Sequence, residues 1–470
     1  MAGHKRRTKI VATIGPATSS RESIQALVAA GMDCARLNMS HGTQDDAARR
    51  LALVREIEAE SGRAIAVMAD LRGPKLRVGD LDAPLELRRD AEVFVSTRQA
   101  AQVGDLVVQP AAIGDALQVG HDILIDDGRI RLRVNELSGG RARCTVIAGG
   151  TVTSQKGVNL PGIQLPIPSL TDKDREDLEW ALGAGVDYVA LSFVRSADDV
   201  RELRAIVEAS GSNVWIVSKI EKAEAVAALD EILTVTDAVM VARGDLGVEI
   251  GVAEVPLVQK RIISAALESR KPVITATQML ETMISSPEPT RAEASDVANA
   301  ILDGTSALML SGETAVGEYP VEAVTMMDRI ALAIEPAMSY RHEIPSASDE
   351  PTIGQAMSNA ACDIAEALEA RALIVPTSSG RTALAVARLR PRRAIAALSH
   401  NQDALRHLAL EWGVTPLLLP ETHDVEDLWG RAVAITRESG IVDAGDRVVI
   451  TAGTQVNIPG STNVIKVDIA

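Results

Sequence analysis

The stretch "DLRGPKLR", Asp70 to Arg77, marks the place where an apolar strand pattern ends in a group of charges. The residues before it, 64–69, form an apolar run that is typical of a buried strand. One carboxylate and three cations then surround a Gly-Pro turn, and the cations are Arg72, Lys75 and Arg77. Four charged residues directly after a buried strand are unusual, and they indicate that the end of this strand has a functional role.

The rest of the chain repeats the strand pattern, and each β-branched run leads to an amphipathic one. The predicted strands are Thr8–Ile14, Cys34–Met39, Ile65–Leu71, Tyr188–Phe193, Val214–Ile220, Ala238–Ala242, Pro272–Thr277 and Ser306–Leu310. The predicted helices are Ser20–Ala30, Gln44–Ser61, Lys173–Gly183, Ala197–Ala209, Ala223–Leu229, Val255–Ser269, Arg291–Leu302 and Val321–Ile334. This alternation implies right-handed crossovers and a parallel sheet. Eight such pairs predict an α/β fold with a closed (β/α)8 TIM barrel, and an open doubly wound sheet is the alternative.

Two segments depart from the barrel pattern. Residues 73–157 contain alternating runs such as "IRLRV" and turn signals such as "DDG", which predict an all-β insertion after the third strand. There it would lie over the catalytic face as a lid. After a predicted linker, "SYRHEIPSASDEPT", the α/β alternation resumes. We therefore predict a barrel from 1–72 and 158–340, a lid from 73–157, and a C-terminal α/β domain from 350–470.

Composition limits the partners and the compartment. The chain has 48 Lys and Arg against 64 Asp and Glu, a net charge of -16, which argues against non-specific binding of nucleic acid or anionic membrane. Three widely spaced cysteines favour a reducing compartment without a disulfide framework. No apolar run approaches the roughly 20 residues of a membrane span. No signal peptide is evident either, so we expect a cytoplasmic protein.

Polar residues gather where the predicted strands end, which in a barrel is the catalytic face. Glu221 and Asp245 follow adjacent strands, and two carboxylates that leave positions open suit Mg²⁺. Lys219 lies two residues before Glu221 and so points to the same side of its strand. A lysine beside a bound divalent cation is suited to neutralise a phosphoryl group in transfer. Any one of these charged residues, taken alone, is better explained as a solvated loop charge or a salt bridge at the barrel rim. Their placement together on one face favours an active site.

Eight motifs give the chain a resemblance to a known family. They are "TKIVATIGPAT", "ARLNMSHG", "SQKGVNLPG", "VSKIE", "MVARGDLGVEI", "ATQMLETM", "PTRAEASDVANAILDG" and "MLSGETAVGEYP". In this collinear order they resemble pyruvate kinase over nearly the whole chain. The resemblance implies a barrel, an inserted β-barrel lid and a C-terminal α/β domain. It also implies phosphoryl transfer from phosphoenolpyruvate to ADP, with ATP as product, Mg²⁺ as cofactor (Mn²⁺ able to replace it) and a homotetramer.

The resemblance also assigns roles to single residues. Arg36 would bind the phosphoryl group, Lys219 would neutralise it in transfer, and Glu221 and Asp245 would hold Mg²⁺. The amides of Gly244 and Asp245 would hold the substrate carboxylate, and Thr277 would lie beside the enolate. Ser311 would belong to a proton relay. The nucleotide phosphates would be contacted by Asn38, His41, Arg77 and Lys156. The proton donor itself is left open.

A second site is expected in the C-terminal domain. The residues after the strand "ALIVP" are Thr377, Ser378, Ser379, Gly380, Arg381 and Thr382, and they lead into a helix. Hydroxyls and amides at a helix N-terminus attract phosphate, although a simple N-cap explains the same residues. The stretch resembles the family's effector loop, with "TAGTQVNIPGSTN" (451–463) as the second loop. We therefore expect a phosphorylated metabolite as effector, of a kind that the sequence does not identify.

Lys75 departs from the pattern of the family's K⁺-dependent members, which typically read "DTKGPEIR" here. In those members the residues matching Asn38, Ser40, Asp70 and the carbonyl of Leu71 surround a monovalent cation. This chain has Leu71 in place of Thr and Lys75 in place of Glu. An ammonium can stand in for the ion, so we expect activity without K⁺. The alternative is that Lys75 only faces solvent at the lid hinge.

Two other function classes remain open. One is a different Mg²⁺-dependent barrel enzyme, such as a lyase, which would not need ADP. The other is an inactive metabolite sensor, which would be expected to lose Lys219, Glu221 or Asp245, and all three are present.

Overall fold

The eight predicted barrel strands all form in the computed structural model of the chain, and they close into one parallel barrel. They are β1 (Lys9–Thr13), β2 (Cys34–Asn38), β3 (Ala66–Asp70), β13 (Tyr188–Leu191), β14 (Trp215–Ile220), β15 (Ala238–Ala242), β16 (Val273–Ala276) and β17 (Ala307–Leu310). β17 pairs with β1 in register Lys9↔Ala307, and this pairing closes the ring. The (β/α)8 prediction is confirmed and the open sheet is excluded.

The structure describes residues 6–97, 101–109, 116–163, 167–338, 352–422, 424–453 and 462–470. Nearly all of the predicted linker and most of the predicted second effector loop, 451–463, lie outside these ranges. Within the described part of the chain, no helix has the length and apolar character needed to span a membrane.

Helices surround the barrel, and several begin at the capping signals in the sequence. They are α1 (Arg21–Ala30), α2 (Gln44–Ser61), α4 (Asp172–Ala184), α5 (Ala197–Ser210), α6 (Ala223–Ala227), α7 (Leu229–Val235), α8 (Arg243–Ile250), α9 (Val255–Glu268), α10 (Arg291–Leu302), α11 (Gly312–Ala315) and α12 (Pro320–Ile334). Thr43, Thr171 and Thr290 each form a capping box with an acid three residues later. Two details differ from the prediction. The helix expected at 223–229 is divided into α6 and α7, and "ARGDLG", expected as a polar strand end, continues into α8.

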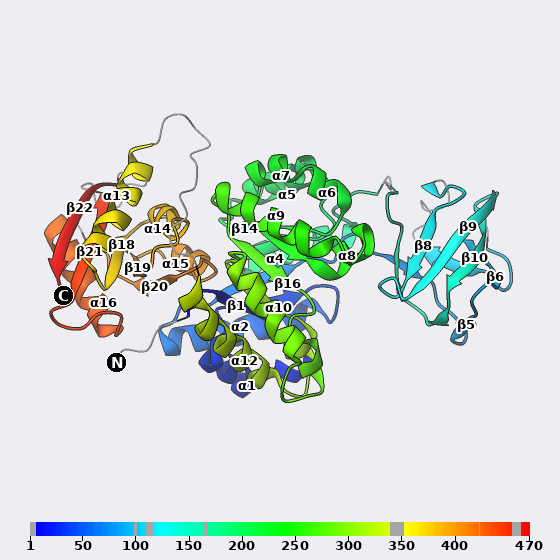
Figure 1. Cartoon of the computed structure of the whole chain (residues 1–470), viewed down its shortest axis with the longest axis horizontal. Helices are drawn as coiled ribbons and strands as arrows, with labels where there is room; N and C mark the ends of the chain where they lie inside the picture. The colour runs from blue at the N-terminus through cyan, green and yellow to red at the C-terminus, as the bar shows by residue number, and fades with distance from the viewer. Residues whose placement is uncertain are drawn as a thin grey trace.

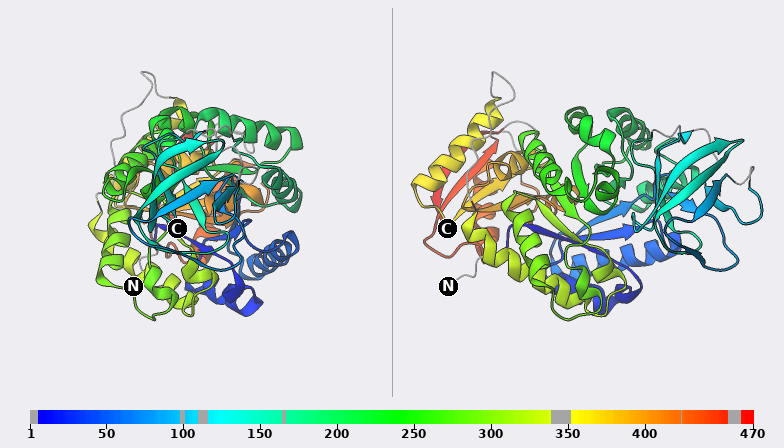
Figure 2. Two further views of the ribbon diagram at one scale, coloured as in Figure 1. Left: turned by 90° about the vertical axis from the view of Figure 1, so that its right-hand side faces the viewer. Right: turned by 45° about the vertical axis from the view of Figure 1, so that its right-hand side comes forward.

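The inserted segment forms a second closed barrel beyond the end of β3. Its strands are β4 (Leu76–Val78), β6 (Glu92–Ser96), β7 (Leu106–Gln109), β8 (Asp122–Ile125), β9 (Ile130–Ser138), β10 (Arg141–Ala148) and β12 (Gly157–Asn159), with β5 (Leu85–Leu87) and β11 (Gly150–Val152) as a separate pair. The chain returns to the first barrel at α4. The second barrel lies beyond one end of the first, at the right of Figure 1, and in front of it in the left view of Figure 2.

The C-terminal domain lies at the other end of the first barrel (Figure 1). Its five-stranded sheet has the order β20-β19-β18-β21-β22. The strands are β18 (Ala372–Pro376), β19 (Ala394–Ser399), β20 (Val414–Leu418), β21 (Arg447–Gly453) and β22 (Thr462–Ile469), with helices α13 (Ile353–Ala367), α14 (Arg381–Ala387), α15 (Gln402–Leu408) and α16 (Val425–Glu438). The final strand, β22, runs antiparallel to β21 and was not predicted.

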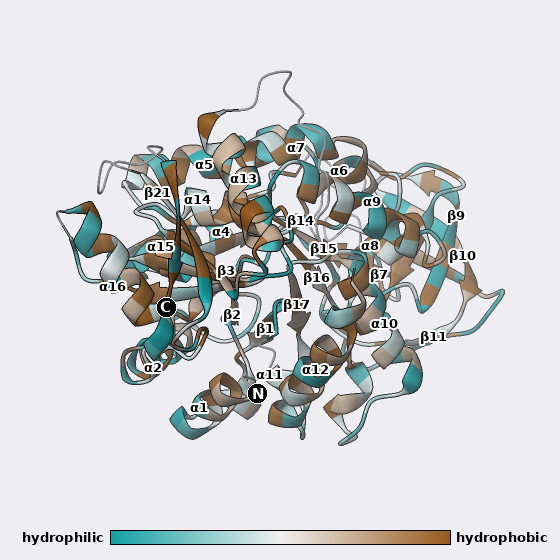
Figure 3. Ribbon diagram, turned by 60° about the vertical axis from the view of Figure 1, so that its left-hand side comes forward, coloured by the Kyte–Doolittle hydropathy of each residue, from teal (hydrophilic) through white to brown (hydrophobic). Residues whose placement is uncertain are grey.

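The C-terminal domain also closes the floor of the barrel. The interior of the barrel is an apolar cluster that includes Met68, Met240 and Met309, and Ala409 and Leu410 belong to the same cluster. These two residues directly follow α15, so they fill the barrel end opposite the lid. Figure 3 shows the apolar strands at the centre of the molecule and hydrophilic residues on its outer helices. The interior of the barrel is therefore a packed core, and the expected place for the active site is the lid end, where the strands have their carboxyl ends.

His407, at the end of α15, is part of this floor. Its ring stacks on Trp215 with centroids 4.4 Å apart, and its Nε2 lies 3.2 Å from the carbonyl oxygen of Asp187. The hydroxyl of Tyr188 donates a 2.5 Å hydrogen bond to the carbonyl of His407. Burial lowers the pKa of His407 to about 4.

We predict that His407 destabilises the fold in mild acid. The unfolded chain takes up this proton near pH 6.5, whereas the folded protein takes it up only near pH 4. The free energy of unfolding should thus fall by about 3 kcal/mol as pH drops between these values, and then level off. His407→Gln should flatten this part of a plot of Tm against pH. The exposed His400 provides the control, His400→Gln, which should follow the wild type. Parallel pH profiles for wild type and His407→Gln would contradict this assignment.

Candidate active site

A buried ammonium between two carboxylates forms the centre of the lid-end mouth. The Nζ of Lys219 lies 2.9 Å from Glu221 Oε1 and 3.3 Å from Asp70 Oδ1. Both carboxylate side chains are 1% exposed and the lysine is 12% exposed. Lys219 and Glu221 come from β14 and its end, and Asp70 is the last residue of β3. The closed barrel thus brings the tips of separate strands into ionic contact.

Arg36 joins this group from β2. Its Nε lies 2.7 Å from Asp70 Oδ2, and one terminal nitrogen donates a 3.0 Å hydrogen bond to Thr13 Oγ1. Ser192 lies on the other side, where Lys219 donates to its Oγ at 2.7 Å. Asp70 therefore holds both cations of the site, and β1 and β13 supply hydroxyls that fix their positions.

Mutual charges set the protonation states. Burial disfavours the ammonium of Lys219, but Asp70 and Glu221 raise its pKa above the ordinary value. Burial likewise opposes ionisation of Asp70, yet Lys219 and Arg36 hold the pKa of Asp70 below its usual range. Burial raises the pKa of Glu221, and the nearby carboxylate of Asp245 raises it further against the pull of Lys219. Lys219 is therefore a fixed positive charge at neutral pH.

The short helix α8 places a second set of groups beside this centre. Gly244 and Asp245 lie in its first turn, and the amide of Gly244 donates a 2.8 Å hydrogen bond to Thr277 Oγ1. Arg243, the first residue of α8, holds this turn in place. It forms an ion pair with Asp296 at 2.7 Å and donates a 2.7 Å hydrogen bond to the carbonyl oxygen of Thr277. Thr277 has a φ of 69°, an uncommon value for a branched side chain, so its position is imposed by its surroundings.

A cleft of about 1210 Å³ separates this surface from the lid. From the barrel it is lined by Gly244, Asp245, Thr277 and Ser311, and from the lid by Asp127 and Arg131 among others. The amide of Ser311 is itself held by Glu313 at 2.7 Å. Asp245, which lines the cleft, lies close enough to Glu221 to raise the pKa of that carboxyl group, so the cleft borders the Lys219 group through Asp245. A cleft of this size can accept a phosphate-bearing substrate.

Lys75 crosses from the lid side into this cleft. Its Nζ lies 3.3 Å from Asp245 Oδ1, and its stem passes over Gly157 of β12, where an added Cβ would approach Lys75 Cε to 3.1 Å. Lys156, in the same hinge, pairs with Asp126 at 2.6 Å. Arg77 donates to the carbonyl of Gln155 at 2.8 Å, while its Nε has no partner among the described residues.

Three of the four residues expected around a monovalent cation, Asp70, Leu71 and Asn38, use their oxygens in contacts within the protein. Both carboxylate oxygens of Asp70 face cations, and the carbonyl of Leu71 accepts a 2.7 Å hydrogen bond from Ser192. Asn38 Oδ1 accepts from the amide of Ser40 at 3.1 Å. His41 is exposed beside them, and partial burial together with Arg77 lowers its pKa. His41 is therefore mainly neutral near pH 7.

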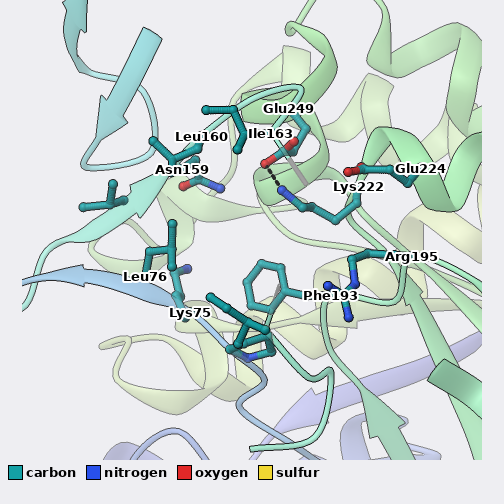
Figure 4. A pocket seen from close by; sticks show the side chains of 13 residues that line it. Lys75, Leu76, Asn159, Leu160, Ile163, Phe193, Arg195, Lys222, Glu224 and Glu249 are labelled. Atoms are coloured by element: carbon teal, nitrogen blue, oxygen red, sulfur yellow. Dashed lines mark hydrogen bonds and ion pairs between the residues drawn. The ribbon is translucent and has the colours of Figure 1, made fainter. Parts of the chain in front are cut away.

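A small pocket at the hinge joins lid and barrel next to this site (Figure 4). Its apolar wall includes Leu76, Leu160 and Phe193. Its polar wall is an ion pair between Lys222 and Glu249, with Nζ and Oε1 2.6 Å apart. This ion pair joins the start of α6 to α8 within the first barrel, and the lid residues Leu76 and Leu160 line the same pocket as Phe193 of the barrel.

Glu221 and Asp245 fit a divalent cation that takes its remaining ligands from water and substrate. Glu221 and Asp245 are close enough for the carboxylate of Asp245 to raise the pKa of Glu221, so a cation between them would relieve their repulsion. In the described part of the chain, no group of three or more His, Cys, Asp or Glu side chains forms a candidate metal site. Mg²⁺ suits two carboxylates because it keeps waters and takes substrate oxygens.

Sequence reasoning missed several supporting groups. Ser192 contacts both Lys219 and Leu71, Thr13 holds Arg36, and the amide of Phe193 donates to Glu221 at 2.8 Å. Ser192 and Thr13 stand at the ends of β13 and β1, so the rule that located the other site residues applies to them too. The contact of Phe193 uses its backbone amide, which every residue except proline has, so the sequence cannot indicate it.

Fold and site together define a class: a (β/α)8 barrel enzyme that fixes cations and carboxylates for an anionic substrate beneath a lid. Residues 5–324 match the pyruvate kinase barrel domain, and residues 355–468 match the pyruvate kinase alpha/beta domain. The chain is 45% identical to a pyruvate kinase of Geobacillus stearothermophilus, over 99% of this chain and 80% of that protein. It is 43% identical to that of Methylorubrum extorquens, over 98% and 97%, and 44% identical to one from Agrobacterium vitis, over 99% and 97%. The chain therefore belongs to the pyruvate kinase family, and it is a phosphotransferase.

Proposed function

We propose that the chain transfers the phosphoryl group of phosphoenolpyruvate to ADP, giving pyruvate and ATP in the last step of glycolysis. The observation that carries this proposal is Lys219, whose charged ammonium lies between Asp70 and Glu221, beside the Asp245 that lines the cleft. Phosphoryl transfer passes through a loose transition state that spreads negative charge, so fixed cations stabilise it. The membership in the pyruvate kinase family supports the same substrates.

Each site group then has a role in this reaction. Arg36 binds the phosphoryl group, and Lys219 neutralises it and the enolate that remains. The amides of Gly244 and Asp245, at the start of α8, hold the substrate carboxylate. Thr277 lies on the side from which carbon is protonated, and Ser311 is placed for a proton relay. Asn38, His41, Arg77 and Lys156 line the approach of the nucleotide phosphates.

Glu221 and Asp245 would hold Mg²⁺, with Mn²⁺ able to replace it. When bound, the metal supplies charge stabilisation to the phosphoryl and carboxylate oxygens. A lyase on the same site is the second candidate, because the barrel residues alone do not demand a nucleotide. Formation of ATP, measured with a hexokinase-coupled assay, distinguishes the two, since a lyase would consume the substrate without ADP.

The family and the composition support a proposal for the compartment and the assembly. We place the protein in the cytoplasm, because its three cysteines are buried and free, as in a reducing compartment. We also infer a homotetramer from the family. Mass photometry tests the assembly, and a monomer at micromolar concentration would contradict it.

We propose an effector site at Thr377–Thr382. In that loop Gly380, with a φ of 81°, begins α14, and its amide donates to Thr377 Oγ1 at 3.0 Å. The hydroxyls of Thr382 and Thr462 lie 2.7 Å apart, so the loop contacts the start of β22. The loop thus presents hydroxyls and amides of the kind that bind phosphate groups.

A phosphorylated metabolite should lower the apparent KM for phosphoenolpyruvate through this loop. Linkage requires that phosphoenolpyruvate tighten effector binding by the same factor. Sugar monophosphates, sugar bisphosphates and AMP should each be titrated against wild type, Thr382→Glu and the matched Thr382→Ser. The response should persist in Thr382→Ser and disappear in Thr382→Glu. If no phosphate ester alters wild-type kinetics, the loop is only a helix cap.

Lys219→Met should abolish turnover while leaving substrate binding largely intact. The variant removes a charge that the transition state uses, so kcat should fall on the order of 10³-fold or more. Lys260→Met, at a lysine 58% exposed on α9, is the matched control and should retain wild-type kcat. Binding of phosphoenolpyruvate by calorimetry separates binding from chemistry. A fall in kcat of less than tenfold would remove Lys219 from this role.

Lys75 makes the enzyme independent of K⁺. Its ammonium lies 3.3 Å from Asp245, and the oxygens of Asp70, Leu71 and Asn38 that were expected around K⁺ already have partners within the protein. We predict near-full activity with Mg²⁺ in a tetramethylammonium buffer. Lys75→Glu would put a like charge near Asp245 and should acquire K⁺ dependence, whereas Arg88→Glu, at an exposed lid position, should not. Strong activation of the wild type by added K⁺ would refute this prediction.

A further inference from the structure

A second large cleft lies between the base of the barrel and the C-terminal domain. Its volume is about 700 Å³. Arginines dominate its lining, namely Arg6, Arg7, Arg371, Arg392, Arg393 and Arg447, against the two acids Glu369 and Asp446. In a chain of net charge -16, this local excess of positive charge is unexpected.

Strand register explains how three of these arginines come together. Ala372 of β18 pairs with Ala394 of β19 and with Val448 of β21. The preceding residue on each strand is an arginine, so Arg447, Arg371 and Arg393 stand side by side at the amino ends of three adjacent parallel strands. Neighbouring strands lie roughly 4.8 Å apart, and residues in register point to the same face. We call this row the arginine ladder.

The ladder is poorly neutralised by the protein. Arg393 Nε lies 3.2 Å from Glu366, a side chain that is 44% exposed. Arg371 and Arg447 form no ion pair with any residue in the described ranges, and Arg447 donates only to the carbonyl of Leu368, at 2.9 Å. Like charges on neighbouring strands destabilise a sheet. The ladder therefore has a charge that an external anion could neutralise.

The barrel supplies the facing wall. Arg6 precedes β1 and is held by Asp33 at 2.9 Å and Asp328 at 2.7 Å. Arg7 crosses to the C-terminal domain, where it donates to the carbonyl of Pro391 at 2.6 Å, beside the ladder. These contacts fix the backbone at the joint, so the cleft is built between two anchored walls.

We propose that this cleft binds a small anion carrying two or more linked phosphate groups. Guanidinium groups match phosphate oxygens in pairs, and a row of three about 10 Å long suits a diphosphate better than a single phosphate. The site differs from the Thr377–Thr382 loop, because that loop follows the carboxyl end of β18 and the ladder precedes its amino end. The five residues of β18 separate them by about 17 Å.

Calorimetry of the full chain with inorganic pyrophosphate tests the proposal, in Mg²⁺-free buffer at constant ionic strength. The wild type should show a binding event that is retained in Thr382→Glu, because the effector loop is elsewhere. In Arg371→Gln/Arg447→Gln the same event should weaken by about tenfold or more, since two charged hydrogen-bond donors are lost. Arg201→Gln, at an arginine 56% exposed on α5, is the matched control and should bind as the wild type does.

Thermal unfolding gives an independent readout. Pyrophosphate should raise the Tm of the wild type and of Arg201→Gln, and should raise that of the double variant much less. Without anion, the double variant should be as stable as the wild type, because it relieves repulsion. Three outcomes would overturn the proposal: unchanged pyrophosphate binding in the double variant, loss of the event in Thr382→Glu, or a large fall in anion-free Tm in the double variant, which would make the ladder a structural element.

Discussion

The ammonium of Lys219, buried between Asp70 and Glu221, is the interaction on which the site depends. A buried charge is tolerated only when partners surround it, and here they come from the ends of β3 and β14, with Ser192 from the end of β13. β14, β13, β3 and β2 are consecutive strands of the barrel, so their ends lie side by side. Arg36 shares Asp70, so displacement of that one carboxylate would remove an ion-pair partner from both cations. Asp70 therefore helps to position Lys219 and Arg36, and it raises the pKa of Lys219.

The sequence predicted the barrel well because its signal is repetitive and local. Each strand is a short apolar run, and several helices begin at a threonine cap, so all eight strands were placed within one or two residues. The side chains of the site also followed from a simple rule, that polar residues at strand ends face one mouth. The prediction named polar residues at the ends of six of the eight strands. It did not name any at the ends of β1 and β13, where Thr13 and Ser192 lie.

Other features depend on contacts between distant segments and had no local signal. Ala409 and Leu410 read as part of a helical pattern, yet they complete the barrel core from the other domain. The helix α8 begins in a motif that was predicted as a polar strand end, and its first turn is held by the ion pair of Arg243 with Asp296. The arginine ladder arises from the register of three strands. In the sequence, Arg371 and Arg393 are 22 residues apart, and Arg393 and Arg447 are 54 residues apart.

The two ends of the barrel therefore have different tasks. At the lid end, Lys219 and Arg36 lie near the ends of β14 and β2 and share the carboxylate of Asp70. At the other end, the C-terminal domain fills the core with apolar side chains and adds the buried His407. In a chain of net charge -16, groups of cations at these two ends can attract anions locally against the overall charge.

The account is tested most directly by incubating the purified chain with phosphoenolpyruvate and ADP and measuring ATP and pyruvate together, with and without Mg²⁺. Equal amounts of ATP and pyruvate should form with Mg²⁺, and neither should form after chelation. Pyruvate formed with release of inorganic phosphate and without ATP, or turnover that persists after all divalent cations are removed, would contradict it.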